Sequence, residues 1–215
     1  ALGSPASAGL EAIFADDFEN GTACVWGIAG PDLCGLFAHT GQDLYRLDPK
    51  TFEILPVGPF NTGGPSMNDI AIDKNDRMVA VSLAKLWSID RTSGAATEIS
   101  PFDGATDGLT SLSFVPLDDG DPGSAERLIA IGGSGNVYEV NPLTGATTQL
   151  GNLGLASGSQ IRSAGDLLSV RGLGTFATVT VGDTATDPDY LATINTTTGT
   201  ATLVGASPTG FDTAS

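Results

Sequence analysis

The chain is poor in the side chains that usually carry catalysis. Its single histidine, His39, stands in the segment Phe37-Ala-His-Thr-Gly41, just before an expected turn and without a titratable partner in view. Acid–base and nucleophilic catalysis need several such groups placed together. The patterns G-x-S-x-G, H-E-x-x-H and C-x-x-C and the phosphate-binding P-loop do not occur in the sequence. We therefore predict no catalytic residues, and a lone surface or loop histidine at His39.

Acidic residues are concentrated in one insertion, Leu117-Asp-Asp-Gly-Asp-Pro-Gly-Ser-Ala-Glu126. Asp119, Asp121 and Glu126 offer hard oxygen ligands of the kind that calcium binds. Gly123 stands where a further ligand would help, and the spacing is not that of an EF-hand. The alternative is a solvated acidic loop between two strands, which the spacing favours. Calcium is thus the one cofactor to consider, and otherwise we predict none.

Two further patterns would suit carbohydrate chemistry. Asp69, Asp73 and Asp76 lie close in sequence and could share one face of the fold as paired carboxylates for glycoside cleavage. Trp26 and Trp87 could stack on sugars. Each tryptophan stands in an apolar strand-like run, however, and this favours packing in the core.

The cysteines and two tripeptides bear on the compartment. Cys24 and Cys34 have nine residues between them, including a Gly-Pro-Asp turn signal. A strand, a turn and a returning strand could bring their Cα atoms within the roughly 4.4–6.8 Å that a disulfide needs. We predict a disulfide-closed hairpin, with two reduced core cysteines as the alternative. Asn20-Gly-Thr and Asn195-Thr-Thr match the N-glycosylation pattern, which matters only in a secreted chain.

The charge of the chain is lopsided. Its 215 residues include 25 Asp and Glu against 9 Lys and Arg, a formal net charge of −16, and all basic residues lie between Arg46 and Arg171. Binding to nucleic acid or to an anionic membrane surface needs clustered basic residues, so we predict neither partner. No apolar run reaches the roughly 18 residues that span a bilayer.

The composition and the start of the chain favour an extracellular location. Lysine is scarce, while Gly, Thr, Ser and Asp are common, and the chain opens Ala-Leu-Gly-Ser-Pro-Ala-Ser like a mature end after signal removal. We predict a secreted protein, with adaptation to high salt as the competing cause of its acidity. Its partners are then expected to be proteins, either further copies of itself or molecules on a cell surface.

An internal repeat organises the chain. Four segments share one pattern of consecutive positions. In order, these are an apolar residue, usually an aromatic residue, any residue, an aliphatic residue, Asp or Asn, two unrestricted positions, Thr or Ser, and usually Gly. They are LYRLDPKTFEILPVG at 44–58, LWSIDRTSGAATEIS at 86–100, VYEVNPLTGATTQLG at 137–151 and LATINTTTGTATLVG at 191–205. Their Asp or Asn anchors are 42, 51 and 54 residues apart, a period typical of propeller blades with loop insertions.

The repeat predicts a hairpin in each segment. The side chains of Asp48, Asp90, Asn141 and Asn195 can accept hydrogen bonds from backbone N–H groups in the turn. Gly94, Gly145 and Gly199 can adopt the left-handed conformation that closes it. Phe52 stands at the corresponding position of the first repeat. We predict that the first turn is built differently.

Two more strand-like runs precede the second and third hairpins. They are Asn68–Asp73 and Arg77–Ser82 before the second, and Ser111–Pro116 and Arg127–Ile131 before the third. Each unit therefore has four short antiparallel strands, and no convincing amphipathic helix occurs. Such a sheet buries both faces only by stacking on its neighbours. The sequence predicts an all-β, propeller-like repeat of about four blades.

LYRLDPKT, LWSIDRTSGAAT and VYEVNPLTGATT resemble the repeats of secreted bacterial β-propeller proteins, whose blades contain Leu-Tyr-x-Ile-Asp-x-x-Thr-Gly. The resemblance covers about residues 33–211 and implies a propeller fold. It implies no single function, because propellers serve as enzymes, binding platforms and scaffolds.

The strands of the first blade are incompletely accounted for. We divide the chain into an arm and the start of the disulfide hairpin at 1–32, and propeller repeats at 33–215. The missing strand must come from the disulfide region, from the arm or from elsewhere. Thr209–Ser215 aligns with Pro65–Ala71 and Asp107–Ser113, where the second and third blades start. This leaves three possibilities: closure of the ring within the chain, a fragment of a longer protein, or strand pairing with a neighbouring molecule.

These features together predict an extracellular, non-enzymatic structural or interaction module. Strand addition between molecules would assemble it into a filament or a surface layer. One alternative is a propeller enzyme of the lactonase or polysaccharide lyase type. Another is a platform on a cell surface that binds glycans or peptides.

Overall fold

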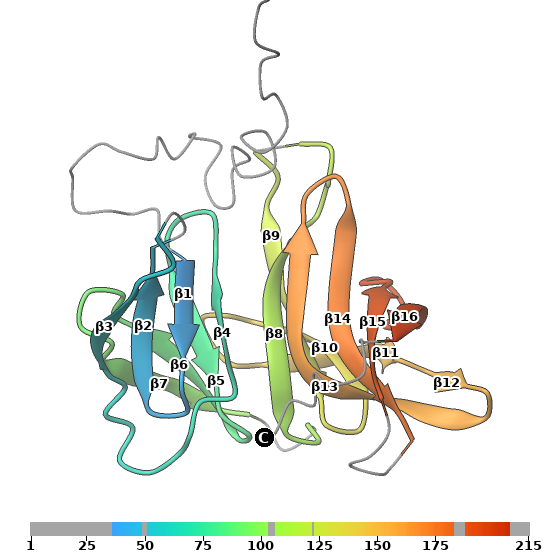
Figure 1. The fold of residues 1–215 in the computed structure, drawn as a ribbon, viewed down its shortest axis with the longest axis horizontal. Helices are drawn as coiled ribbons and strands as arrows, with labels where there is room; N and C mark the ends of the chain where they lie inside the picture. The colour runs from blue at the N-terminus through green and yellow to red at the C-terminus, as the bar shows by residue number, and fades with distance from the viewer. Residues whose placement is uncertain (1–35, 49–50, 103–105, 122, 183–187, 207–215) are drawn as a thin grey trace, which may run out of the picture.

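The computed structural model describes residues 36–48, 51–102, 106–121, 123–182 and 188–206. Within these ranges the chain forms sixteen strands and no helix. The strands make four antiparallel sheets, arranged as the blades of a four-bladed β-propeller (Figure 1). The predicted all-β propeller fold is confirmed. Along the described ranges no helix is long and apolar enough to cross a membrane.

The blades follow one another along the chain. Blade 1 contains β1 (Leu36–His39), β2 (Asp43–Leu47) and β3 (Ile54–Pro59). Blade 2 contains β4 (Asp69–Ile72), β5 (Met78–Val81), β6 (Lys85–Ile89) and β7 (Ala96–Pro101). Blade 3 contains β8 (Leu109–Pro116), β9 (Glu126–Gly132), β10 (Asn136–Val140) and β11 (Thr147–Asn152). Blade 4 contains β12 (Leu155–Ala156), β13 (Ser159–Val170), β14 (Gly174–Val181), β15 (Asp189–Ile194) and β16 (Ala201–Ala206).

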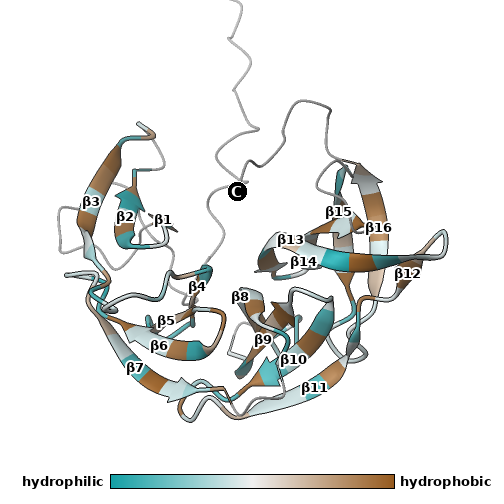
Figure 2. Cartoon of the chain, turned by 90° about the horizontal axis from the view of Figure 1, so that it is seen from below, coloured by the Kyte–Doolittle hydropathy of each residue, from teal (hydrophilic) through white to brown (hydrophobic). Residues whose placement is uncertain are grey.

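The blades form an arc around a common centre. Strands β4, β8 and β13 lie nearest the centre, and β3, β7, β11 and β16 lie at the periphery (Figure 2). In the described part of the chain the arc is open between blade 1 and blade 4. The segment 209–215, which the sequence offered as a further strand, lies outside the described residues.

The hydrophobic core consists of three layers, each between two successive blades. Between blades 1 and 2, Leu44 packs with Met78 and Trp87. The layer between blades 2 and 3 contains Leu86 and Tyr138 among other side chains. Apolar residues of blades 3 and 4, among them Ile131 and Val179, form the third layer. A propeller sheet has two apolar faces, so blades 2 and 3 each bury both of theirs.

The hairpins explain how one strand serves two layers. In β2, β6 and β10 the first residue of the repeat faces the next blade, and the aromatic second residue of β6 and β10 faces the preceding blade. A register shift between these two residues recurs in all four hairpins. Alternation along a strand places neighbouring side chains on opposite faces. The same fifteen-residue pattern therefore builds every blade.

Candidate functional site

Each hairpin turn is organised by one Asp or Asn side chain. Asp90 Oδ1 accepts hydrogen bonds from the hydroxyl and the N–H of Thr92 at 2.6 and 2.8 Å, and these bonds lower the pKa of Asp90. Asn141 and Asn195 accept bonds from N–H groups two and three residues further on, at 2.9–3.2 Å. Asp48 accepts one from the N–H three residues on at 3.0 Å. The side chains act on the local backbone.

The turn of blade 1 corrects the sequence prediction. Gly94, Gly145 and Gly199 adopt φ values of 77°, 72° and 73°, and Phe52 adopts the same left-handed region at 58°. The N–H of Phe52 donates to the carbonyl of Asp48 at 2.7 Å, as each glycine does to its own anchor at 2.8 Å. At the described residues Asp48, Thr51 and Phe52 the turn is built like the other three, against the prediction of a different turn. Phe52 takes a conformation that costs a residue with a Cβ about 1–2 kcal/mol.

These turns also form the contacts between blades. A Cβ added to Gly94 would lie 2.7 Å from the carbonyl carbon of Gly58 in the outer strand of blade 1. Real Cβ atoms do not approach the backbone so closely, so only glycine fits this position. The same contact recurs at the two following interfaces, between Gly145 and Ser100 and between Gly199 and Gly151.

The inner edge of blade 1 is open in the part of the chain that the structure describes. β1 is the edge strand of its sheet and pairs with β2, with His39 opposite Leu44. The hairpin closes with the N–H of Thr40 donating to the carbonyl of Asp43 at 2.9 Å. Hydrogen-bonded and non-hydrogen-bonded pairs alternate in an antiparallel ladder. The backbone groups of His39 and Phe37 therefore point away from β2, toward the open edge.

Blade 2 shows what this edge is shaped to bind. Its second strand, β5, holds the place of β1, and it pairs on its inner side with β4. There Val79 lies opposite Ala71 and Val81 lies opposite Asp69. Blades 3 and 4 likewise place a strand at this position, β8 and β13. Among the described strands, blade 1 alone lacks this inner neighbour.

Asp69 joins blades 2 and 3 near the centre of the arc. One carboxylate oxygen accepts from the N–H of Ile70 and the other from the N–H of Leu112, both at 2.7 Å. The residue is 7% exposed. Burial raises the pKa of Asp69 well above its usual value, and the nearby Asp166 raises it further, against the lowering effect of the two hydrogen bonds. The bond from Leu112 thus holds β4 against β8, and the bond from Ile70 stays within β4.

The other two carboxylates considered for glycoside cleavage have different surroundings. Asp69 is the first residue of β4 and Asp73 follows its last, so about 13 Å of extended chain lies between them. Asp73 pairs with Arg77 at 2.9 Å, and Asp76 pairs with Arg91 at 2.8 Å. The structure therefore does not bring the three carboxylates together, and those of Asp73 and Asp76 form ion pairs with arginines.

The acidic insertion is tied to blade 2. The Lys74 ammonium, from the turn between β4 and β5, donates to the carbonyls of Gly123 and Ser124 at 2.7 and 2.5 Å. The backbone N–H of Lys74 donates to Glu126 Oε2 at 2.8 Å. The loop is therefore not simply solvated, as the sequence favoured, because a cation of the protein itself is bound by its carbonyl oxygens.

The carboxylates predicted to bind calcium have separate partners. Asp119 accepts from the N–H of Gly172 in blade 4 at 3.0 Å, and Asp121 from that of Gly123 at 2.8 Å. Burial raises the pKa of Glu126, against the hydrogen bond from Lys74. Within the described ranges, no three His, Cys, Asp or Glu side chains lie close enough together to hold a metal ion.

The remaining predicted site residues fall into two groups. Asn20, Cys24, Cys34 and Trp26 lie outside the described residues, so the disulfide, one glycosylation site and one tryptophan stay predictions. Asn195 lies exposed in the blade 4 turn, where its side-chain oxygen accepts the two backbone bonds given above.

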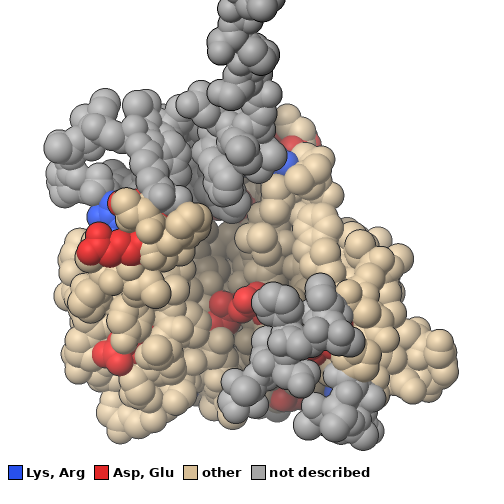
Figure 3. Space-filling model, in the orientation of Figure 1, with Lys and Arg blue, Asp and Glu red and all other residues tan. Residues whose placement is uncertain are grey.

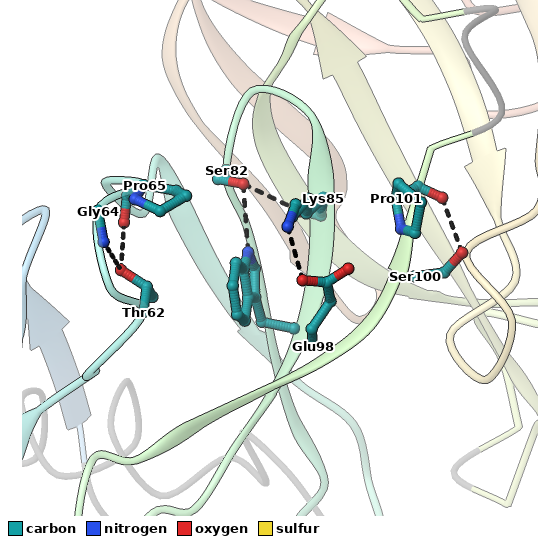
Figure 4. A network of polar contacts seen from close by, with 9 residues as sticks. Thr62, Gly64, Pro65, Ser82, Lys85, Glu98, Ser100 and Pro101 are labelled. Carbon is teal, nitrogen blue, oxygen red and sulfur yellow. Dashed lines mark hydrogen bonds and ion pairs between the residues drawn. The ribbon is translucent and has the colours of Figure 1, made fainter.

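His39 and Trp87 both lie near the interface of blades 1 and 2. The His39 ring is half-buried, packs edge-on against Phe60 at 6.2 Å and places Nδ1 2.9 Å from the Thr40 carbonyl. Trp87 is 5% exposed, and its Nε1–H donates to the Ser82 hydroxyl at 3.2 Å, beside the Lys85 and Ser82 contacts of Figure 4. The prediction that Trp87 packs in the core is confirmed.

The sequence missed the polar contacts that cross between blades. Lys74 is the clearest, because nothing in its sequence neighbourhood points to a loop about 50 residues away. Asp107 makes a further contact that the sequence missed, at the start of blade 3: its carboxylate accepts from the Ser134 N–H at 2.7 Å and from the Tyr138 hydroxyl at 3.0 Å of the same blade. The molecular face of Figure 3 is hollowed between the blades, and acidic side chains show at that hollow.

Comparison with known proteins identifies no family for this chain. No protein-family model and no curated protein matches the chain. Similar solved structures include a nidogen–laminin complex (13% identity, TM-score 0.48), covering 80% of this chain and 60% of that one. An auxiliary nutrient binding protein from Bacteroides thetaiotaomicron is 14% identical (TM-score 0.46; 80% and 38% covered). An oligogalacturonate lyase in complex with manganese is also 14% identical (TM-score 0.43; 81% and 50% covered). The chain thus spans 38–60% of the length of these structures.

Proposed function

We propose that the protein is a non-enzymatic interaction module that assembles with further copies of itself by β-strand addition at the open edge of β1. The observation that carries this proposal is the missing inner neighbour of β1 among the described strands. A row of unpaired N–H and C=O groups at a sheet edge is a template for a strand from another chain. Blades 2 to 4 show that a strand fits at this position.

Two observations support a role without catalysis. The carboxylates considered as catalytic or metal-binding groups hold backbone N–H groups or arginines, as described above. His39 has an aromatic and a carbonyl neighbour. Groups engaged in this way serve to join elements, which suits a scaffold. The proposal that the module is extracellular rests on the acidic, lysine-poor composition and on the likeness of its repeats to those of secreted bacterial propeller proteins.

A single backbone substitution tests strand addition. His39→Pro removes an N–H that points to the open edge while leaving the ladder between β1 and β2 intact, because proline is tolerated on the free side of an edge strand. The matched control is His39→Ala, which removes the same side chain but keeps the N–H. We expect wild type and His39→Ala to form oligomers in light scattering and electron microscopy as concentration rises, and His39→Pro to remain monomeric.

Other outcomes would contradict the proposal. Equal assembly of His39→Pro and His39→Ala would show that the edge of β1 is not the contact. A wild-type protein that stays monomeric at every concentration would show that copies do not pair at this edge. Circular dichroism on both variants confirms that each is folded before the masses are compared.

A further inference from the structure

The outward face of blade 4 repeats the surface that receives the next blade elsewhere in the molecule. The first residue of each hairpin repeat faces the following blade, and Leu44, Leu86 and Val137 are each 0% exposed there. The equivalent residue of blade 4, Leu191, is 44% exposed. Leu168, on the same face, is 48% exposed. Blade 4 thus carries the apolar side chains of an inter-blade layer without the blade that covers them elsewhere.

In the described part of the chain, the last position of the repeat also contacts the following blade, except in blade 4. Gly58, Ser100 and Gly151 each receive the hairpin turn of the following blade in direct contact. The equivalent residue of blade 4 is Gly205, which lies opposite Leu191 in the ladder, and a Cβ added to it would meet no atom of the described residues within 4 Å. Three occupied examples and one open example of the same small-residue position define a receptor surface.

Each described turn that docks on such a surface carries glycine, where an added Cβ would be crowded. At Gly94 an added Cβ would lie 2.7 Å from the Gly58 carbonyl carbon, and at Gly199 it would lie 3.0 Å from the Gly151 Cα. Among the described hairpins the turn without a preceding blade is that of blade 1, and it carries Phe52 at the same position with the same left-handed φ. Phe52 is 73% exposed. Its Cβ blocks blade 1, of the same molecule or of a second copy, from docking on blade 4 as the other blades dock.

From this asymmetry we infer that blade 4 presents a docking surface, formed by Leu168, Leu191 and Gly205, for a propeller blade whose hairpin turn carries glycine. The incoming blade has the chemistry that blades 2 to 4 display: an Asp or Asn anchor, glycine four residues later, and an apolar face toward Leu191. Phe52 makes the contact selective, because it excludes the molecule's own first blade. This inference concerns the opposite end of the arc from β1 and is independent of strand addition.

The Phe52→Gly variant is the probe, because it turns blade 1 into a blade of the required kind. Labelled Phe52→Gly protein is titrated against wild type, and the dissociation constant is measured by analytical ultracentrifugation. The matched control is Phe52→Ala, which loses the ring but keeps the Cβ. We expect Phe52→Gly to bind at least about tenfold more tightly than Phe52→Ala, since the Cβ alone prevents the contact. Strand addition contributes equally to both variants, so their ratio reports only docking on blade 4.

The acceptor side is tested with Gly205→Val in the titrated partner. The space around Gly205 leaves the fold of this variant undisturbed, while valine fills the place of the incoming turn. We expect it to abolish the difference between Phe52→Gly and Phe52→Ala. Docking of blade 1 on blade 4 within one molecule would also support the inference, seen as a smaller radius of gyration that Gly205→Val reverses. Equal affinities of the glycine and alanine variants, or a tighter contact that survives Gly205→Val, would overturn it.

Discussion

At the scale of single residues, one position in each hairpin turn decides how closely two blades approach. Gly94, Gly145 and Gly199 combine a left-handed backbone with a contact that leaves no room for a Cβ at the first two and only a tight fit, at 3.0 Å, at the third. Phe52 has the backbone but not the contact. The same residue type is thus required twice, by the turn and by the neighbouring blade, and the exception stands where the described arc has no preceding blade.

Asp69 gives a prediction about pH. Its pKa is raised in the folded protein, so the folded state keeps the proton to a higher pH than the unfolded chain. Stability from this group is therefore complete below the unfolded pKa of about 4 and is lost as pH rises through the raised value. Asp69→Asn cannot ionise and lacks this loss. We expect its deficit in unfolding free energy relative to wild type to be largest near pH 4 and to shrink toward neutral pH.

Urea unfolding of both proteins across this pH range measures the difference. Glu126, whose pKa is also raised, is present in both and cancels. A deficit that stays constant with pH would show that the Asp69 carboxyl does not change its protonation in this range.

At the scale of elements, the insertion between β8 and β9 links blade 3 to both neighbouring blades. It reaches blade 2 through Lys74 and blade 4 through the hydrogen bond between Asp119 and the N–H of Gly172. A second link between blades 3 and 4 joins the Arg127 guanidinium to the Thr196 carbonyl at 3.0 Å. Loops that appear as insertions in the repeat period therefore hold neighbouring blades in place.

Lys74→Met tests the link between blade 2 and the insertion. The change keeps the length of the side chain but removes the ammonium from the two carbonyls of the loop, which leaves partly buried acceptors without that donor. We expect a loss of about 1–3 kcal/mol in the free energy of unfolding, measured in urea. The matched control is Lys85→Met, because Lys85 pairs with Glu98 at 2.6 Å on the surface, where both side chains are more than a third exposed (Figure 4).

The control is expected to cost less, about 0–1 kcal/mol, because an exposed ion pair adds little to stability. If the two substitutions lowered the free energy of unfolding equally, the bonds from Lys74 to the insertion would stabilise the fold no more than a surface ion pair does. The insertion would then not stabilise the contact between blades.

At the scale of the whole molecule, charge opposes assembly. Each chain carries a formal charge of −16, so two copies repel one another at long range. Strand addition and apolar contact between blades involve no compensating positive surface. Any association must therefore depend on backbone hydrogen bonds and on apolar burial, which act at short range.

This dependence predicts that salt strengthens assembly. Raising NaCl from about 20 mM to about 500 mM shortens the Debye length several-fold and weakens the repulsion between copies. We expect the oligomer fraction of wild type in sedimentation velocity to rise over this range, while His39→Pro stays monomeric throughout. An oligomer that dissociates as salt is added would instead point to ion pairs at the contact.

The sequence alone determined the fold class and the positions of the four hairpins. Both depend on local pattern: alternation along a strand, an Asp or Asn anchor, and a period of 42 to 54 residues between anchors. The upstream strands of blades 2 and 3 were predictable for the same reason. The core position of Trp87 followed from its apolar strand.

Only the tertiary structure decided which blade faces are covered, because this depends on neighbours far away in the sequence. It placed the Lys74 ammonium against the carbonyls of the acidic insertion, separated the carboxylates of Asp69 and Asp73, and showed that Phe52 adopts the left-handed φ of the glycines. The identities of these residues were visible in the sequence, but their partners were not. A repeat specifies how each blade is built, whereas the contacts at its two ends arise only when the blades are stacked and one end of the stack differs from the other.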